Sequence, residues 1–110
     1  MIYLYSSETQ TQIEPLLQTG LVLLCFSAPW CGTCRAVKRT LTEFDRRGLA
    51  SIVEIDVDRE KAIGKQYGIQ GVPALLLLKD GRIIDRIAGS LDYEEFKAWI
   101  GKNENWQGLL

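Results

Sequence analysis

The sequence has no histidine and only three cysteines, three prolines and one methionine among its 110 residues. Structural zinc needs two pairs of histidine or cysteine ligands, so the chain cannot complete a zinc site around one cysteine pair. No stretch is long and apolar enough to span a membrane, and no signal peptide pattern is visible. We therefore expect no metal and no membrane anchor, and a cytoplasmic location.

Neither sign of charge is in excess. Thirteen basic residues stand against fourteen acidic ones, which gives no field that favours nucleic acid or an anionic membrane. Hydrophobic residues make up 46% of the chain, which argues against disorder. The length fits one core, and no repeats or low-complexity tracts are present. These features predict a single globular domain over residues 1–110.

The most informative feature is the segment Trp30-Cys31-Gly32-Thr33-Cys34, which joins an apolar strand pattern to a helix pattern. The predicted helix begins at Cys31, where unpaired backbone N–H groups and the helix dipole favour a thiolate. A thiolate is a nucleophile at neutral pH, so Cys31 is predicted to attack a disulfide. Cys34 lies one turn later on the same face and can resolve the mixed disulfide.

The cysteine pair has two other interpretations. A structural disulfide between Cys31 and Cys34 would close a very short loop and so constrain little unfolded-state entropy. A degenerate copy that has lost its redox role is the remaining alternative. A Cys-x-x-Cys at a strand-to-helix junction is strong evidence for redox chemistry, particularly in a reducing compartment.

Strand and helix patterns alternate along the chain. The first helix is predicted to open at Thr11, where Thr11–Glu14 matches a capping box and Pro15 falls in the first turn. The alternative begins at Ser7 with a kink at Pro15. The central buried strand is expected at Leu21–Ser27. The other predicted elements are strands Ile2–Tyr5, Ser51–Val57, Ala74–Leu78 and Ile83–Ala88, and helices from Cys31 to about Arg47, from Arg59 to Tyr67, and from Asp92.

The last third of the chain carries clear turn and cap signals. Lys79-Asp80-Gly81-Arg82 predicts an antiparallel hairpin. Asp92 with Glu95 predicts a capping box for the last helix, and Leu91 with Phe96 predicts a hydrophobic staple. The buried stripe of this helix is predicted to be Phe96, Trp99 and Ile100, with Trp106 and Leu109 of the tail packing back on the body. The expected fold is α/β: a β-α-β-α-β half and a β-β-α half forming one mixed sheet with helices on both faces.

The cysteine segment, together with Gly71-Val72-Pro73, Asp56-Val57-Asp58 and Lys79-Asp80-Gly81, resembles the thioredoxin family over essentially the whole chain. The resemblance implies a thioredoxin fold, a redox disulfide between Cys31 and Cys34, and a cis peptide bond before Pro73 that faces it. It also implies strand-like pairing of substrate with the backbone of Val72. The implied substrate-binding residues are Trp30, Gly32, Thr33, Gly71, Val72, Pro73 and Gly89.

Several positions depart from the family pattern. Thr33 replaces the usual proline between the cysteines and adds a hydroxyl near the sulfurs, which implies a less reducing protein. Arg39 replaces a proline that kinks the active-site helix, so a straighter helix is expected. Cys25 stands where the family has a buried Asp beneath the disulfide, and a buried thiol is a poor base because burial raises its pKa. The simplest role for Cys25 is as a small hydrophobic residue in the core.

Glu54 stands where the family often has a Lys next to that Asp. By register with the family, its side chain points toward Cys25, and a carboxylate there could take the proton of the resolving thiol. We predict Glu54 as the base; the alternative is that it is a solvated strand residue.

The leading predicted function is reduction of protein disulfides through Cys31 and Cys34. No bound cofactor or metal is expected, and a thioredoxin-reductase-like donor would return electrons to a monomeric protein. The alternatives are a specialised oxidant or isomerase, or a partner-binding module with incidental redox activity.

Overall fold

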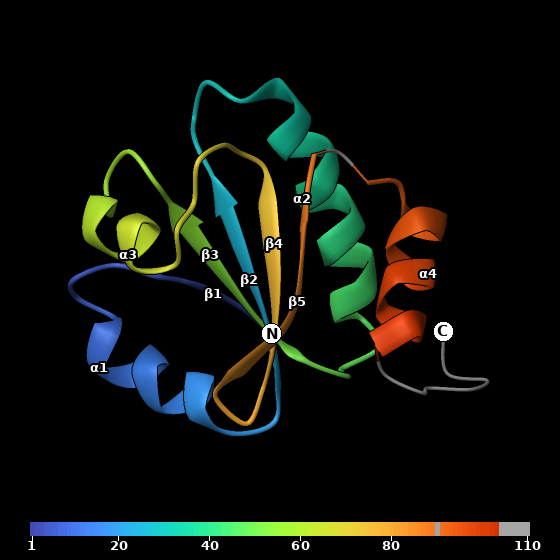
Figure 1. Cartoon of the computed structure of the whole chain (residues 1–110), viewed down its shortest axis with the longest axis horizontal. Helices are drawn as coiled ribbons and strands as arrows, with labels where there is room; N and C mark the ends of the chain where they lie inside the picture. The colour runs from blue at the N-terminus through green and yellow to red at the C-terminus, as the bar shows by residue number, and fades with distance from the viewer. Residues whose placement is uncertain (90, 104–110) are drawn as a thin grey trace.

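The computed structural model describes residues 1–89 and 91–103 (Figure 1). Its elements alternate much as the sequence predicts, and the active-site segment lies between β2 and α2. In chain order they are β1 (Ile2–Leu4), α1 (Gln10–Ile13), the 3₁₀ helix η1 (Glu14–Gln18), β2 (Leu21–Ser27), α2 (Gly32–Asp45), β3 (Ser51–Asp56), α3 (Lys61–Gln66), β4 (Ala74–Lys79), β5 (Arg82–Ala88) and α4 (Tyr93–Asn103).

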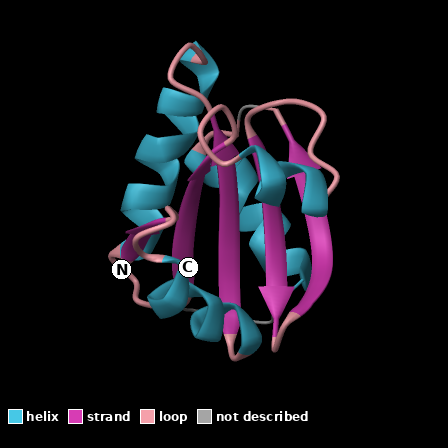
Figure 2. Ribbon diagram, turned by 90° about the vertical axis from the view of Figure 1, so that its left-hand side faces the viewer, coloured by secondary structure: helices cyan, strands magenta, loops and turns pink. Residues whose placement is uncertain are grey.

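The strands form one mixed sheet in the order β1-β3-β2-β4-β5. β1, β3 and β2 are parallel, whereas β4 runs antiparallel to β2 and β5 antiparallel to β4. Figure 2 shows helices on both faces of the sheet. The predicted thioredoxin fold, with its mixed sheet between two helical layers, is confirmed.

The central strand β2 separates two hydrophobic cores. Its alternate side chains Val22, Leu24 and Phe26 pack with α1, η1 and α3, while Leu23 and Cys25 pack with α2 and α4. All five are buried. The prediction that this apolar strand is central and covered on both faces is therefore confirmed, and Cys25 faces the layer that contains α2.

The start of the first helix was predicted wrongly. No cap forms at Thr11, because the chain is already helical from Gln10, and Pro15 lies in the first turn of the 3₁₀ helix that begins at Glu14. Ser6 and Thr9 instead bond reciprocally: each backbone N–H donates to the other's hydroxyl oxygen, at 2.9 and 3.2 Å. The hydroxyls that organise this turn therefore precede the predicted capping box.

Other predicted boundaries differ by one to three residues, mostly because turns occupy the ends. α2 begins at Gly32, with Cys31 as its N-cap, and ends at Asp45. α3 begins at Lys61 rather than Arg59, since Val57–Arg59 form a turn. The exchange of predicted helix for turn lengthens the loop between β3 and α3, next to the active site.

The predicted hairpin between β4 and β5 is present. Its two-residue turn consists of Asp80 and Gly81, with φ of 49° and 84°, the left-handed region that this type of turn requires. Asp80 also fixes the hairpin to the start of β2, because its carboxylate accepts from Gly20 N–H at 2.8 Å. The hairpin lies at the end of the sheet opposite the cysteine pair (Figure 1).

The cap of α4 is formed as predicted. Glu95 N–H donates to the Asp92 carboxylate at 2.8 Å, and Asp92 N–H donates to the Glu95 carboxylate at 3.1 Å. The staple residues Leu91 and Phe96 are both buried in the same core, together with Trp99 and Ile100. The predicted packing of Trp106 and Leu109 lies outside the described residues.

Asp85 on β5 holds the C-terminal half of α4. Its Oδ2 accepts hydrogen bonds from Trp99 Nε1 at 2.9 Å and Asn103 Nδ2 at 2.8 Å, and Lys102 Nζ lies 3.6 Å away. The hydrogen bond from Asn103 is the main cause that lowers the pKa of Asp85. One carboxylate thus connects the last helix to an edge strand.

Among residues 1–89 and 91–103, no helix is both long enough and apolar enough to cross a membrane.

Candidate active site

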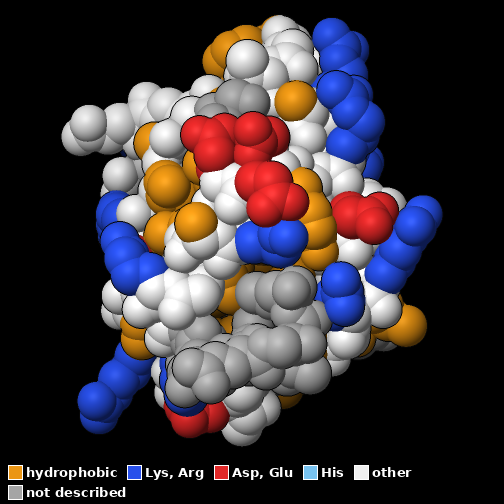
Figure 3. Space-filling model, turned by 90° about the vertical axis from the view of Figure 1, so that its right-hand side faces the viewer, with side chains coloured by type: hydrophobic (Ala, Val, Ile, Leu, Met, Phe, Trp, Pro, Cys, Tyr) orange, Lys and Arg blue, Asp and Glu red, His pale blue; other side chains and the backbone are white. Residues whose placement is uncertain are grey.

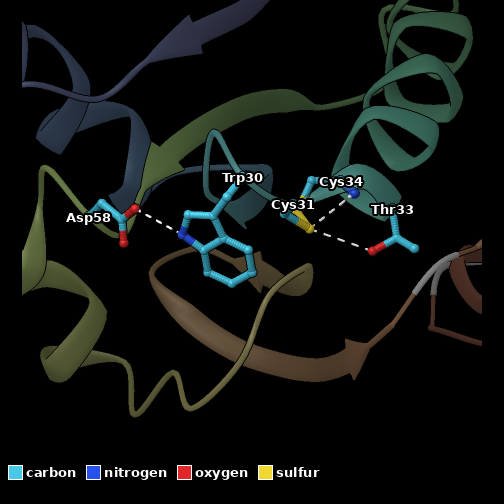
Figure 4. Close-up of a disulfide and its surroundings, with 5 residues drawn as sticks. All are labelled: Trp30, Cys31, Thr33, Cys34 and Asp58. Carbon is cyan, nitrogen blue, oxygen red and sulfur yellow. Dashed lines mark hydrogen bonds between the residues drawn. A yellow bond between two sulfur atoms is a disulfide. The ribbon is translucent and has the colours of Figure 1, made fainter.

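Cys31 and Cys34 form a disulfide at the start of α2, with Cα atoms 5.3 Å apart (Figure 4). A turn after β2, closed by Cys31 N–H donating to Ala28 C=O at 3.1 Å, carries the chain into the helix. Cys31 is the N-cap, and its Sγ accepts the backbone N–H of Cys34 at 3.2 Å. This N–H and the positive end of the helix dipole would both stabilise a thiolate at Cys31 in the reduced protein.

The two cysteines do not differ in accessibility. Cys31 is 5% exposed and Cys34 is 7% exposed in the disulfide form. Exposure therefore does not distinguish the attacking thiol from the resolving thiol in this state. The two cysteines differ in their electrostatic surroundings, because Cys31 Sγ, at the N-cap, accepts a hydrogen bond from the backbone N–H of Cys34.

Thr33 places a hydroxyl beside the nucleophilic sulfur. Its Oγ1 lies 3.5 Å from Cys31 Sγ, on the opposite side of the disulfide from Trp30 (Figure 4). In the disulfide form only the hydroxyl can donate, and in the reduced form it could donate to a Cys31 thiolate. Thr33 thus adds a second donor aimed at the same sulfur.

Trp30 lies on the outer side of the disulfide, which we define as the side that carries the Gly71–Pro73 loop. It is 70% exposed, and its indole Nε1 donates to Asp58 Oδ2 at 3.0 Å, which fixes the ring beside the disulfide (Figure 4). A groove of about 260 Å³ lies between this ring and α3. Its lining consists of Trp30, Val57, Lys61, Gly64, Lys65, Ile69, Gln70, Gly71 and Val72.

The Gly71–Pro73 loop separates this groove from a second hollow. The Val72–Pro73 peptide bond is cis, as the family resemblance implies, and Pro73 C=O accepts from Gly89 N–H at 3.0 Å. The second hollow has a volume of about 490 Å³, and Val72, Pro73 and Gly89 are among its lining residues. Of the predicted substrate-binding residues, Trp30, Gly71, Val72, Pro73 and Gly89 line these two neighbouring depressions, while the exposed Gly32 and Thr33 lie between the cysteines.

A different pocket, also of about 260 Å³, lies on the inner side of the disulfide. It joins the two redox cysteines to Cys25 and to Glu54 on β3, the residue paired with Cys25 across the parallel ladder. Its full lining is Leu4, Cys25, Ser27, Ala28, Pro29, Cys31, Cys34, Arg35, Lys38, Glu54 and Asp56. The predicted direction of Glu54, toward Cys25 and the space beneath the disulfide, is consistent with this lining.

Lys38 is a member of this inner pocket that the sequence analysis missed. Its Nζ lies 3.7 Å from Glu54 Oε2, and the Glu54 side chain is only 17% exposed. The one available signal was spacing, because Lys38 follows Cys34 by four residues and so shares its face of α2. The ion pair links the active-site helix to β3.

Cys25 is unsuited to the role of base. Burial, followed by the nearby Glu54 carboxylate, raises its pKa to about 12, while Lys38 acts in the opposite direction. The thiol therefore stays protonated at neutral pH. This confirms the expectation that Cys25 is a poor base and leaves Glu54 and Asp56 as the carboxylates of β3 that line the pocket with Cys34. Asp56 Oδ1 already accepts hydrogen bonds from the backbone N–H groups of Asp58 and Arg59.

In the part of the chain that the structure describes, no group of three or more His, Cys, Asp or Glu residues is arranged to hold a metal ion.

Comparison with known proteins agrees with this geometry. The sequence model of the family described as thioredoxin matches residues 3–102. The chain belongs to the thioredoxin family. It is 36% identical over 86 residues to a thioredoxin of Bacillus subtilis, covering 76% of this chain and 83% of the relative. It is 38% identical over 96 residues to a thioredoxin of Listeria monocytogenes, covering 86% and 93%.

Solved thioredoxin structures share its fold. A mutant thioredoxin from Halobacterium salinarum superposes with a TM-score of 0.82 at 28% identity, covering 93% of this chain and 89% of that one. A thioredoxin from Nicotiana alata gives a TM-score of 0.82 at 27% identity, covering 94% and 93%. With the Cys31–Cys34 disulfide at the family's strand-to-helix junction, the protein is a thiol–disulfide oxidoreductase that acts on protein disulfides.

Proposed function

We propose that Cys31 is the attacking thiol and Cys34 the resolving thiol of this oxidoreductase. The observation that carries the assignment is the N-cap position of Cys31, whose sulfur accepts the Cys34 N–H at 3.2 Å. In the reduced protein, the Cys31 thiolate attacks one sulfur of a substrate disulfide, and the other substrate sulfur leaves as a thiolate. A mixed disulfide between Cys31 and the substrate results.

Resolution requires Cys34 to lose its proton. Glu54 is the proposed acceptor, directly or through one water, because its carboxylate and Cys34 line the same inner pocket. The Cys34 thiolate then attacks Cys31 Sγ and expels the second substrate thiolate. The substrate gains two electrons, and the Cys31–Cys34 disulfide forms.

The outer surface binds the substrate. An extended segment pairs with the backbone of Val72 beside Pro73, in the manner of an added strand. Trp30, Gly71 and Gly89 bound the apolar depressions on either side, while Gly32 and Thr33 form the rim between the cysteines. The shallow shape of these depressions suits many protein substrates rather than one small molecule.

The catalytic cycle needs an external electron donor. A thioredoxin-reductase-like protein would return the disulfide to the dithiol, and the exchange itself uses no bound cofactor. From the similarity to bacterial thioredoxins, we propose a cytoplasmic location and a role in electron transport and redox homeostasis. We further propose that the protein is a monomer with a single domain, residues 1–110.

A second candidate function is supported by Thr33. Its hydroxyl, 3.5 Å from Cys31 Sγ, would stabilise the reduced thiolate and so make the protein a stronger oxidant. A specialised oxidant or isomerase would use the same two cysteines. A measured reduction potential separates this candidate from a general reductant.

The test of function is catalysis of insulin disulfide reduction by dithiothreitol. The protein should accelerate precipitation of the insulin chains, and Cys31→Ser should lower the rate to that of dithiothreitol alone. Cys34→Ser should instead accumulate a mixed disulfide with substrate that mass spectrometry detects.

Brief iodoacetamide treatment of the reduced protein near neutral pH should label Cys31 before Cys34. Preferential labelling of Cys34 would reverse the assignment of the two thiols.

A further inference from the structure

Charge is unevenly distributed between residues 35–47, which comprise most of α2 and the two residues after it, and the rest of the chain. Residues 35–47 contain five basic and two acidic residues, a net charge of +3, whereas the other residues contain eight basic and twelve acidic ones, a net charge of −4. The five are Arg35, Lys38, Arg39, Arg46 and Arg47. The near-neutral total therefore conceals a basic segment in an otherwise acidic chain.

Four of these side chains line one groove along α2. We call these four residues the basic row: Arg35, Lys38, Arg39 and Arg46. The groove has a volume of about 410 Å³, and Thr42 and Glu43 complete its lining. Spacings of three, four and seven residues keep such positions on one side of a helix. Figure 3, which views the side of the molecule that carries α2 and α4, shows Lys and Arg side chains in a row along one edge.

The basic row begins at the disulfide. Arg35 and Lys38 line both the groove and the inner pocket that contains Cys31 and Cys34. The guanidinium of Arg35 turns back toward the helix start, because its Nη2 lies 3.9 Å from where a Cβ on Gly32 would be. A ligand in the groove would therefore have one end next to the reactive sulfurs.

Part of the row has no counter-charge. Lys38 pairs with Glu54, and Arg46 pairs with Glu43 at 3.3 Å. Within residues 1–89 and 91–103, Arg35 and Arg39 form no ion pair or hydrogen bond through their side chains. Like charges four residues apart destabilise a helix by about 0.2–0.5 kcal/mol. Folding therefore does not account for this pair.

We propose that the basic row binds an acidic segment of the protein substrate while the substrate's disulfide lies at Cys31. The proposal rests on the proposed function, since it names a feature of the substrates reduced there. From residue 35 to residue 46 the helix rises roughly 16 Å, which is about the length of five residues of extended chain. The net charge of −4 outside residues 35–47 opposes a long polyanion that extends beyond the row, so a short acidic peptide segment fits better than nucleic acid.

The test uses three peptides that contain the same intramolecular disulfide and differ in a flanking run of four Glu, four Gln or four Lys residues. At low ionic strength we expect kcat/KM for the Glu peptide to exceed that for the Gln peptide by about three- to tenfold, with the Lys peptide lowest. Added salt should remove the difference, because it screens exposed charges. Arg39→Glu should bring the Glu-to-Gln ratio near one, and Arg39→Lys should retain it.

Arg82→Glu is the matched control, because Arg82 lies at the hairpin, at the opposite end of the sheet from the disulfide (Figure 1). It makes the same charge change and should keep the preference. Equal rates for Glu and Gln peptides in the unaltered protein, or a preference that survives in Arg39→Glu, would overturn the proposal. Inhibition by a single-stranded DNA oligonucleotide, abolished by Arg39→Glu without any peptide preference, would assign the row to nucleic acid instead. Failure to reduce even the Gln peptide would refute the proposed function itself.

Discussion

The two sides of the disulfide differ in the kinds of chemical group that line them. On the outer side, backbone groups and apolar surfaces dominate: the cis Val72–Pro73 bond, the N–H of Gly89 and the ring of Trp30. On the inner side, the pocket contains a buried thiol at Cys25 and the Lys38–Glu54 ion pair. In the mechanism proposed above, the outer side contacts the substrate backbone and the inner side governs proton transfer to and from Cys34.

The largest expected effect is on the inner side and concerns the alkaline stability set by Cys25. Its pKa of about 12 in the folded protein exceeds its ordinary value of 9.0. The unfolded chain therefore loses the thiol proton first, so this stability is complete below about pH 9 and declines as pH rises toward 12. We expect the free energy of unfolding to fall by about 1.4 kcal/mol per pH unit over that range from this group alone.

Urea unfolding of the oxidised protein at several pH values between about 8 and 11 measures this decline. The oxidised form keeps Cys31 and Cys34 from titrating. Cys25→Ala should show a shallower decline, while the contributions of Tyr5 and Tyr67, whose pKa values burial also raises, stay common to both proteins. Parallel profiles would show that the Cys25 thiol does not differ between the folded and unfolded states.

Glu54→Gln tests whether the inner side handles protons. The change is nearly isosteric, so it removes the charge while keeping the volume. Formation of the mixed disulfide should be unchanged, and its resolution at pH 7 should slow on the order of tenfold, a modest effect for the loss of a general base. The deficit should shrink as pH approaches the pKa of the resolving thiol.

Rapid-mixing kinetics with a chromophoric disulfide would separate the two steps. Lys38→Met provides a comparison, since it removes the partner of Glu54 but keeps the carboxylate. Equal resolution rates in Glu54→Gln and the unaltered protein across the pH range would leave water as the proton acceptor. The inner pocket would then have a different set of residues from the outer side but no role in proton transfer.

Thr33→Pro tests the border between the two sides. Loss of the hydroxyl 3.5 Å from Cys31 Sγ should destabilise the reduced form, so the protein should become more reducing. One hydrogen bond to a thiolate corresponds to a shift of about 30 mV, or about 1.4 kcal/mol for two electrons. Equilibration with glutathione measures the potential, and Thr33→Val separates the hydroxyl from the proline ring. An unchanged potential in both variants would exclude Thr33 as a tuning residue.

The smallest expected effect lies on the outer side. Asp58→Ala should free the indole of Trp30, whose hydrogen bond to Asp58 spans 3.0 Å at an exposed position. A net loss of about 0.5–1 kcal/mol predicts a two- to fivefold rise in KM for a protein substrate, with kcat unchanged. Asp58→Asn retains an oxygen acceptor and should behave like the unaltered protein. A fall in kcat instead would show that Trp30 acts in the chemical step.

The sequence predicted those features that depend on neighbouring residues. The Asp80-Gly81 turn and the Asp92–Glu95 cap are each specified by residues close together in the sequence. The position of the cysteine pair at the start of a helix was likewise predictable, because an apolar strand pattern directly precedes it. Thr11 was misassigned as a cap because a second pair of hydroxyls, Ser6 and Thr9, lies just before it. Local rules could not choose between two adjacent candidates.

The contacts that the sequence did not predict join residues from different elements. The pairs Lys38–Glu54 and Trp30–Asp58 connect a helix or loop to β3 or its following turn, and no local pattern specifies which carboxylate each will meet. The nearly equal burial of Cys31 and Cys34 likewise depends on how the loops close over the disulfide. Sequence reasoning therefore located the reactive atoms but not the electrostatic surroundings of the inner pocket.

The attachment of α4 to β5 has a consequence for how this sequence can vary among its relatives. Because Asp85 Oδ2 accepts from both Trp99 and Asn103, the three positions form one polar unit. Loss of the acceptor alone leaves the indole N–H of the buried Trp99 and the Asn103 amide without their partner, whereas joint replacement by apolar residues removes donors and acceptor together. Positions 85, 99 and 103 should therefore change together across the family, and an alignment would reveal them as correlated columns.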